Sequence, residues 1–133
     1  EMLLPYALTS HVRDSAVWLA PDGINVRWVN MGDGNVDIDG WIKTFIAAKP
    51  GLPIIFENLV SGRPRVHAIH DPKFWNNWRK MPAWEYARFY ALAAKGTPKL
   101  ATPLPAGKTA GQQKIDDLET CVRYTRALLT RIS

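Results

Sequence analysis

Apolar positions along the first half of the chain predict two strands separated by a helix. Residues 3–12 favour extended structure, and polar residues gather at the C-terminal end of this segment. Residues 39–49 place their apolar side chains on one helical face, with Asp39 as the N-cap. Residues 53–60 form a short, nearly continuous apolar run, typical of a strand buried on both faces of a parallel sheet. This order is one βαβ unit, and it predicts an α/β architecture.

The segments around this unit are less regular. Residues 15–38 are loop-like, with a short strand or a hairpin as a further option around the turn signal Pro21-Asp22-Gly23. Residues 61–82 form a long irregular stretch, and long structureless segments are usually functional or disordered. Because this stretch is rich in aromatic residues, we expect an ordered, packed loop rather than a linker.

The C-terminal part of the chain predicts two helices and a connector. Residues 83–95 carry a strong helical pattern that ends at Gly96, and residues 97–111 form an extended connector rich in proline, glycine and alanine. Residues 112–132 predict a terminal helix whose apolar stripe docks on another surface. The stripe consists of Ile115, Leu118, Val122, Thr125, Leu129 and Ile132. We therefore separate residues 1–96 from a connector and docking helix over residues 97–133.

Composition limits the size and the compartment. The 133 residues, with a mass of 15.0 kDa, suffice for one small domain but not for a complete eight-unit α/β barrel, which needs about 250 residues. No apolar run approaches the roughly 20 residues that span a bilayer, so we expect no membrane association. The single cysteine, Cys121, excludes an internal disulfide framework and favours a reducing compartment, so we expect a cytoplasmic protein.

The charge balance is basic but dispersed. The chain carries a net charge of +5 and has a pI near 9.6. Its 17 lysines and arginines are scattered, and the densest local group is Arg63 and Arg65, with Arg79-Lys80 beyond it. A dispersed charge favours a solvated surface over a nucleic-acid interface.

Two ionisable residues lie where the predicted strands end. His11 lies near the end of the first strand, and Glu57 interrupts the apolar run of the second. A carboxylate within an apolar strand is costly unless it is paired or binds a metal, and imidazole and carboxylate are both good ligands for a divalent ion. The alternatives are a hydrogen-bonded histidine at the strand end and a salt bridge between Glu57 and a nearby arginine. The shared placement favours a joint site.

Other polar residues have a simpler alternative in packing or pairing. Arg13 points the same way as His11 if the strand continues, and its planar guanidinium suits a substrate oxygen or phosphate, although Arg13 and Asp14 also suit pairing with neighbours. For His67 and His70 we favour packing with Trp75 and Trp78 over metal binding. Cys121 on the terminal helix predicts inert packing.

Three short motifs together resemble a known family. They are Ser-His-Val-Arg-Asp-Ser at residues 10–15, Met-Gly-Asp-Gly-Asn-Val-Asp at 31–37 and Ile-Ile-Phe-Glu-Asn at 54–58. In this order and spacing they resemble the C-terminal half of the sugar phosphate isomerase/epimerase family, the xylose-isomerase-like (β/α)8 barrel group. Residues 71–89 and 117–124 are similar to one branch of it.

The resemblance implies a fold, a metal and a reaction. Residues 1–96 would be the last two β/α units of a (β/α)8 TIM barrel, and residues 97–133 a C-terminal helical extension. By resemblance, His11 and Glu57 are the third and fourth ligands of a divalent metal ion (Mn, Mg, Co or Zn). Glu57 is also the general base that moves a proton next to the carbonyl of a sugar or sugar derivative, and Arg13 contacts the substrate.

The chain lacks the first six strands of such a barrel, and with them two metal ligands and the partner acid. Three explanations stay open: a portion of a longer enzyme, a subunit that completes its barrel with another subunit or copy, or a non-catalytic remnant. The same barrel also hosts lyases and dehydratases. A further alternative is a binding module that recognises a carbohydrate or a protein through its Trp75 and Trp78 loop. Nucleic-acid binding is the least favoured.

Overall fold

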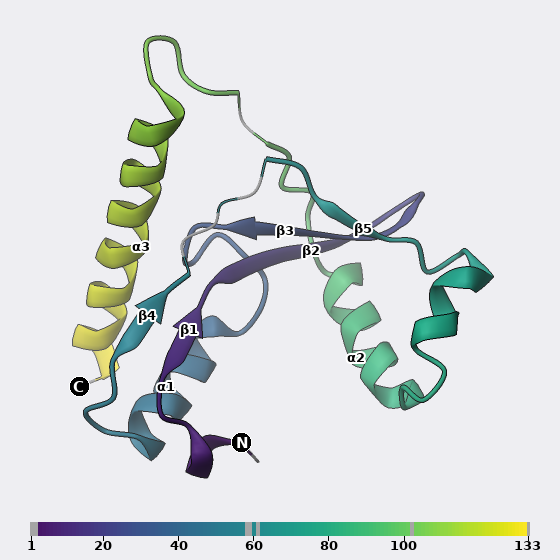
Figure 1. The fold of residues 1–133 in the computed structure, drawn as a ribbon, viewed down its shortest axis with the longest axis horizontal. Helices are drawn as coiled ribbons and strands as arrows, with labels where there is room; N and C mark the ends of the chain where they lie inside the picture. Colours follow the sequence, from purple (N-terminus) through teal and green to yellow (C-terminus); the bar gives the residue numbers. More distant parts are fainter. Residues whose placement is uncertain (1–2, 58–59, 61, 102, 133) are drawn as a thin grey trace.

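The chain passes from one small sheet into another at Asp14 (Figure 1). The computed structural model describes residues 3–57, 60, 62–101 and 103–132. Strand β1 (Ser10–Val12) pairs in parallel with β4 (Ile54–Phe56). Strands β2 (Asp14–Ala20), β3 (Gly23–Val29) and β5 (Arg65–His67) form an antiparallel sheet in the order β2-β3-β5. The fold is therefore mixed α/β.

Helix α1 (Ile38–Ala48) connects the two parallel strands on the chain path from β1 to β4, as the βαβ pattern predicts. The N-cap is Asp37 rather than Asp39: its carboxylate accepts a hydrogen bond from the Gly40 N–H. The Ile42 and Phe45 side chains of α1 are 0% and 1% exposed. Burial of each contributes about 2–3 kcal/mol, which fixes α1 against the sheet.

Two expected strands are shorter than predicted. The segment 3–12 contains a 3-10 helix, η1 (Leu4–Tyr6), and becomes extended enough to pair only at Ser10. Pro5 suits the first turn of a helix, because its φ is fixed and it has no N–H to leave unpaired. The second strand extends only over Ile54–Phe56, and Ile55 is 40% exposed, so the expectation of burial on both faces is wrong. Residues 58 and 59 lie outside the described part of the chain.

Two expected loops contain strands. Residues 14–29 form a hairpin of two seven-residue strands, in which Gly23 follows the Pro21-Asp22 turn with a φ of 138°. The sequence offered a short strand or a hairpin here only as an option, because polar Asn25 and Arg27 interrupt the apolar pattern of β3. In the irregular stretch 61–82, β5 pairs with β3, and η2 (Pro72–Asn77) is a 3-10 helix.

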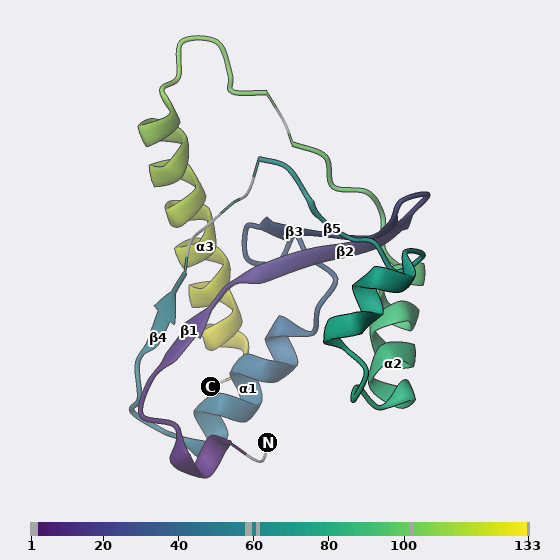
Figure 2. The same ribbon diagram turned by 45° about the vertical axis from the view of Figure 1, so that its right-hand side comes forward.

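Helix α2 (Ala83–Ala94) confirms the helix predicted at residues 83–95 and covers the antiparallel sheet. Its Ala93 shares a buried cluster with Val17 and Ile24 of the hairpin, and Phe89 and Tyr86 pack against that cluster. Figure 2 shows α2 beside η2, on the side of the molecule away from α3.

Helix α3 (Ala110–Ile132) packs its buried side chains through its C-terminal half, and in its first half Asp117 accepts a hydrogen bond from the Asn30 side chain at 3.3 Å. Cys121 and Leu128 lie in one buried cluster with Val12, Met31 and Ile42. In contrast, Ile115 and Leu118 are 59% and 43% exposed, so the first turns of the predicted stripe do not dock on the described part of the chain. Figures 1 and 2 show this half of α3 extending beyond the sheets.

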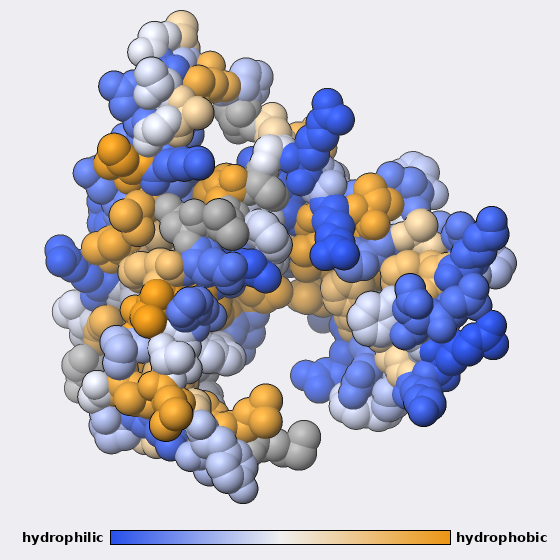
Figure 3. All heavy atoms as spheres, viewed as in Figure 1, coloured by the Kyte–Doolittle hydropathy of each residue, from blue (hydrophilic) through white to orange (hydrophobic). Residues whose placement is uncertain are grey.

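The surface differs in hydropathy between two parts of the molecule. In Figure 3 apolar side chains gather over the part built from β1, β4 and α3, whereas hydrophilic side chains dominate the part that contains α2. No helix within residues 3–57, 60, 62–101 and 103–132 is long and apolar enough to cross a membrane.

Candidate functional site

The three predicted site residues lie on one face of the β1–β4 pair. Ser10 and Val12 are buried, so His11 between them points to the exposed face, opposite Ile55 in the parallel register. Glu57 directly follows β4, and its backbone N–H donates to the Val12 carbonyl at 2.9 Å. Because side chains alternate along strands, His11, Arg13 and Glu57 share the face opposite the buried Val12.

Arg13 and Glu57 form an ion pair. One guanidinium nitrogen of Arg13 lies 3.0 Å from Glu57 Oε1. The guanidinium also lies over the Trp28 ring, 4.1 Å from its centroid. The two paired side chains are 37% and 38% exposed, so solvent screens their attraction. The salt bridge considered as the alternative for Glu57 is therefore present.

His11 and Glu57 alone do not fit a complete divalent-metal site. A catalytic ion in proteins usually has at least three protein ligands, and here two candidate donors share the face. Across the described ranges no group of three or more His, Cys, Asp and Glu side chains could hold a metal ion. The carboxylate of Glu57 is moreover engaged by Arg13.

Asp14, in the same motif as His11, stabilises the loop of residues 32–34 through hydrogen bonds to its backbone. Its side chain is 1% exposed, and its carboxylate accepts hydrogen bonds from the backbone N–H groups of Ser15, Gly32 and Gly34 at 2.7, 2.9 and 3.1 Å. Burial raises the pKa of Asp14 above its usual value, and the three amide donors oppose that rise. The carboxylate therefore holds the 32–34 loop against the start of β2.

The two loop glycines are required by this arrangement. Gly32 has a φ of 89°, where other residues are strained, and a side chain there would meet the ring of Tyr124. A side chain at Gly34 would meet the Asp14 carboxylate. The Gly-Asp-Gly motif thus positions a loop.

A basic pocket adjoins Arg13 on the antiparallel sheet. It is a cavity of about 370 Å³, and its lining combines three arginines with two rings. The lining residues are Arg13, Val26, Trp28, Arg63, Pro64, Arg65 and His67. The sequence indicated the density of Arg63 and Arg65 but not the place of Trp28, because it offered the hairpin that presents Trp28 only as an option, without a register.

The histidines of the 61–82 segment do not form a pair of metal ligands. His67 lies edge-on to Phe74 and Phe89, with ring centroids 6.1 and 6.0 Å away, so it packs as expected but with other rings than Trp75 and Trp78. Burial, together with the charge of Arg65, lowers the pKa of His67. His70 is exposed in the following turn.

The two tryptophans of this segment differ in environment. The Trp75 indole N–H donates to the Ile69 carbonyl at 2.9 Å, and its ring packs edge-on against Tyr86. Trp78 is 45% exposed and stacks on Phe74. Trp75 thus holds the segment together, and Trp78 is the exposed ring of the two.

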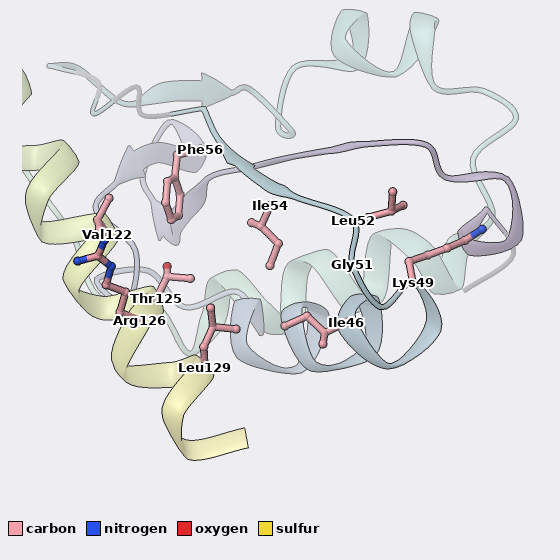
Figure 4. A pocket seen from close by; sticks show the side chains of 10 residues that line it. All are labelled: Ile46, Lys49, Gly51, Leu52, Ile54, Phe56, Val122, Thr125, Arg126 and Leu129. Carbon is pink, nitrogen blue, oxygen red and sulfur yellow. The ribbon is translucent and has the colours of Figure 1, made fainter. Parts of the chain in front are cut away.

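An apolar hollow of about 320 Å³ lies between α1, β4 and α3 (Figure 4). Ile46, Ile54, Phe56 and Leu129 line it together with Thr125. The hydroxyl of Thr125 is buried, and no atom of the described residues forms a hydrogen bond with it. Nearby, the Met31 N–H donates to Cys121 Sγ at 3.3 Å, and burial raises the pKa of this thiol, which agrees with its predicted role in packing.

Comparisons with known proteins add no relative. No family model, no curated protein and no solved structure matches the chain. The class that the fold defines is a mixed α/β protein with one parallel and one antiparallel sheet. Any statement about function therefore depends on the residues themselves.

Proposed function

We propose that this chain is the C-terminal portion of a sugar or sugar phosphate isomerase/epimerase-like enzyme that depends on a divalent metal. One observation carries the proposal: the parallel β1–α1–β4 unit presents His11 and Glu57 on the same face, near the C-terminal ends of adjacent strands. His11 is the middle residue of the three-residue strand β1, and Glu57 directly follows β4. This is the edge at which parallel α/β proteins collect their catalytic groups.

The rest of the fold would come from outside the described residues. In a (β/α)8 barrel, β1 and β4 would be the last two strands, and six more would pair with their open edges. Those strands would supply the further metal donors that His11 and Glu57 lack, from the same polypeptide or from another subunit. In this arrangement residues 97–133 are an extension that docks through the C-terminal half of α3.

The residues of this chain have distinct roles in the proposed reaction. The Glu57 carboxylate removes the proton from the carbon next to the substrate carbonyl and returns it to the adjacent position or face. Negative charge then develops on the carbonyl oxygen, and the Arg13 guanidinium, 3.0 Å from Glu57, stabilises it by hydrogen bonding. His11 is a metal ligand, and a bound metal would polarise the same oxygen.

The test combines metal binding with proton exchange. Mn²⁺ binding is followed by the loss of the free-ion electron paramagnetic resonance signal. Exchange of the proton next to the carbonyl is followed by NMR in D₂O, with a panel of ketoses and ketose phosphates. His11→Ala and Glu57→Gln should each weaken Mn²⁺ binding about tenfold or more, and Glu57→Gln should abolish exchange. Glu119→Gln, an exposed carboxylate on α3, is the control and should change neither.

Arg13→Gln sharpens this test. Removal of the guanidinium releases Glu57 from its ion pair, so Mn²⁺ binding should strengthen while exchange slows. If Mn²⁺ binds equally to the wild type, His11→Ala and Glu57→Gln, the ligand assignment is wrong.

The second candidate is a non-catalytic binding protein of the same fold. The Arg13–Glu57 ion pair favours it, because that pair occupies the carboxylate a metal would need. A chain that binds sugar derivatives, but shows neither Mn²⁺ binding nor proton exchange, would establish this alternative.

A further inference from the structure

The basic pocket beside Glu57 gathers positive charge from two segments of the chain. Arg13 follows β1, Arg63 precedes β5, and Arg65 is the first residue of β5. Trp28 and His67 complete the polar and aromatic part of its wall. We propose that this pocket is an oxyanion subsite that binds the phosphate monoester of a small, sugar-like ligand.

Strand register places these groups on one face. In the antiparallel sheet Trp28 lies opposite Ser15, and Arg65 lies opposite Val26. Val26 and Trp28 are two residues apart and share a face, as do Ser15 and Arg13, so the side chains of Arg13, Trp28 and Arg65 converge on one side. The hairpin, β5 and the end of β1 together build the pocket.

The pocket carries excess positive charge. Glu57 neutralises Arg13 in part, with a nitrogen–oxygen distance of 3.0 Å. Of the carboxylates in the described ranges, none lies within salt-bridge distance of Arg63 or Arg65. Burial is the main cause of the lowered pKa of His67, and the charge of Arg65 adds to it.

The chemistry favours a phosphate monoester over a neutral sugar. Guanidinium groups donate paired hydrogen bonds to oxyanions, and three of them match the three terminal oxygens and the nearly double charge of a phosphate monoester. The Trp28 ring holds the Arg13 guanidinium at 4.1 Å, so less side-chain freedom is lost on binding. A cavity of about 370 Å³ is in the range of small-molecule sites.

The ligand of this pocket is a small molecule rather than a nucleic acid. The remaining lysines and arginines are dispersed over the chain and do not extend the pocket into a groove that would follow a phosphate backbone. The identity of this ligand with the substrate rests on the proposed function. The binding of an oxyanion in this pocket does not depend on that function.

Isothermal titration calorimetry on the full chain with EDTA tests the subsite. The probes are ribose 5-phosphate, ribose, inorganic phosphate and ribonate. Ribose 5-phosphate should bind, and ribose should not. The Arg63→Gln/Arg65→Gln variant should lose about tenfold or more in affinity, because it removes two charged donors that would contact the phosphate. Lys43→Gln/Lys114→Gln removes two exposed charges elsewhere and should retain the wild-type affinity.

The alternatives give different results. Equal losses in both double variants would overturn the subsite, since they would reflect net charge alone. Tighter binding of ribonate than of ribose 5-phosphate would show that the pocket prefers a carboxylate to a phosphate, and it would overturn the ligand assignment. A single-stranded oligonucleotide that displaces ribose 5-phosphate, with a steep salt dependence, would overturn the small-molecule assignment in favour of nucleic acid.

Glu57→Gln separates this inference from the proposed function. Loss of the carboxylate frees Arg13, so ribose 5-phosphate should bind more tightly to this variant without metal. If no proton exchange is found but this gain occurs, the subsite stands and the proposed reaction fails. If exchange occurs without measurable phosphate binding, the reaction stands and the subsite fails.

Discussion

Asp14 is a buried carboxylate whose partners are all backbone amides. The three donors come from the next residue and from a loop 18 to 20 residues away. A buried charge without such donors would be several kcal/mol less stable, so the loop and the carboxylate depend on each other.

Asp14→Asn should therefore lower the free energy of unfolding by about 2 kcal/mol or more, because an amide nitrogen would face a backbone donor. Urea denaturation measures the change. Asp33→Asn is the matched control, since Asp33 is exposed in the same loop, and it should stay within about 0.5 kcal/mol of wild type. Equal stabilities of the two variants would contradict the structural role of Asp14.

His67 should make stability sensitive to acid. Its pKa is lowered in the folded state, so the folded protein binds the proton less tightly than the unfolded chain. Neutral His67 therefore contributes fully to the free energy of unfolding above the unfolded pKa, about 6.5. This contribution is lost as the pH falls through that value toward the folded pKa. The slope is at most about 1.4 kcal/mol per pH unit.

Denaturation curves between pH 5 and 8 in wild type and two variants test this pH dependence. His67→Phe keeps a ring against Phe74 and Phe89. This variant should remove most of the decrease in the free energy of unfolding that the wild type shows at acidic pH. His70→Gln, in the exposed turn three residues later, should leave the pH profile of the wild type unchanged. A His67→Phe profile parallel to the wild type would show that another group is responsible.

The sequence indicated where the residues of the site lie, and it offered a salt bridge of Glu57 with a nearby arginine, which Arg13 forms. The alternation of side chains along a strand correctly predicted that His11 and Arg13 point in the same direction. The distribution of basic residues along the sequence identified Arg63 and Arg65 as the densest group. The partners of Asp14 and the stacking of Arg13 on Trp28 could not be predicted, because the sequence offered a hairpin only as an option and did not give the register of residues 14–29.

At the scale of elements, helices were predicted better than strands. Helices α1 and α2 have clear periodicity and termination signals, such as Gly96 after α2. These signals lie within the local sequence, so they predict the helices without knowledge of the tertiary contacts. The length and burial of a strand depend on the segments that pair with it and cover it. Residues 54–56 look like a fully buried strand, yet the described part of the chain covers only one of their faces.

Helix α3 carries one polar group that its packing does not satisfy. Thr120 and Thr130 donate to the carbonyls four residues earlier, but the buried Thr125 hydroxyl has no partner among the described residues. Thr125→Val should raise the free energy of unfolding by about 1 kcal/mol or more, measured by urea denaturation, because it replaces this hydroxyl with a methyl group.

Thr120→Val is the matched control for this prediction. Its hydroxyl is exposed and bonded, so the substitution should give no gain in stability. Loss of stability in Thr125→Val would mean that a water molecule or a ligand in the hollow of Figure 4 satisfies the hydroxyl.

At the scale of the whole molecule, the open face of the β1–β4 pair should drive association. Ile55 is 40% exposed in the centre of this pair, and two parallel strands leave both outer edges without a partner in the described chain. We expect light scattering to give a particle mass above 15.0 kDa.

Ile55→Lys should shift the particle toward the monomer, because a charge on this face opposes docking of another sheet. Leu100→Lys, at a 70% exposed position in the connector, is the control and should leave the mass unchanged. A wild-type chain that is monomeric at all concentrations would argue against self-association through this face.

The continuous path from β1 into β2 links the two halves of the molecule mechanically. One extended segment, residues 10–20, contributes to both sheets, and the Asp14 carboxylate clamps it to the 32–34 loop at the crossing point. Neither sheet can open without disturbing the other, so amide hydrogen exchange should report one cooperative unit across the crossing. The slowest-exchanging amides should then include those of Val12 and Val17, from two sheets that look separate.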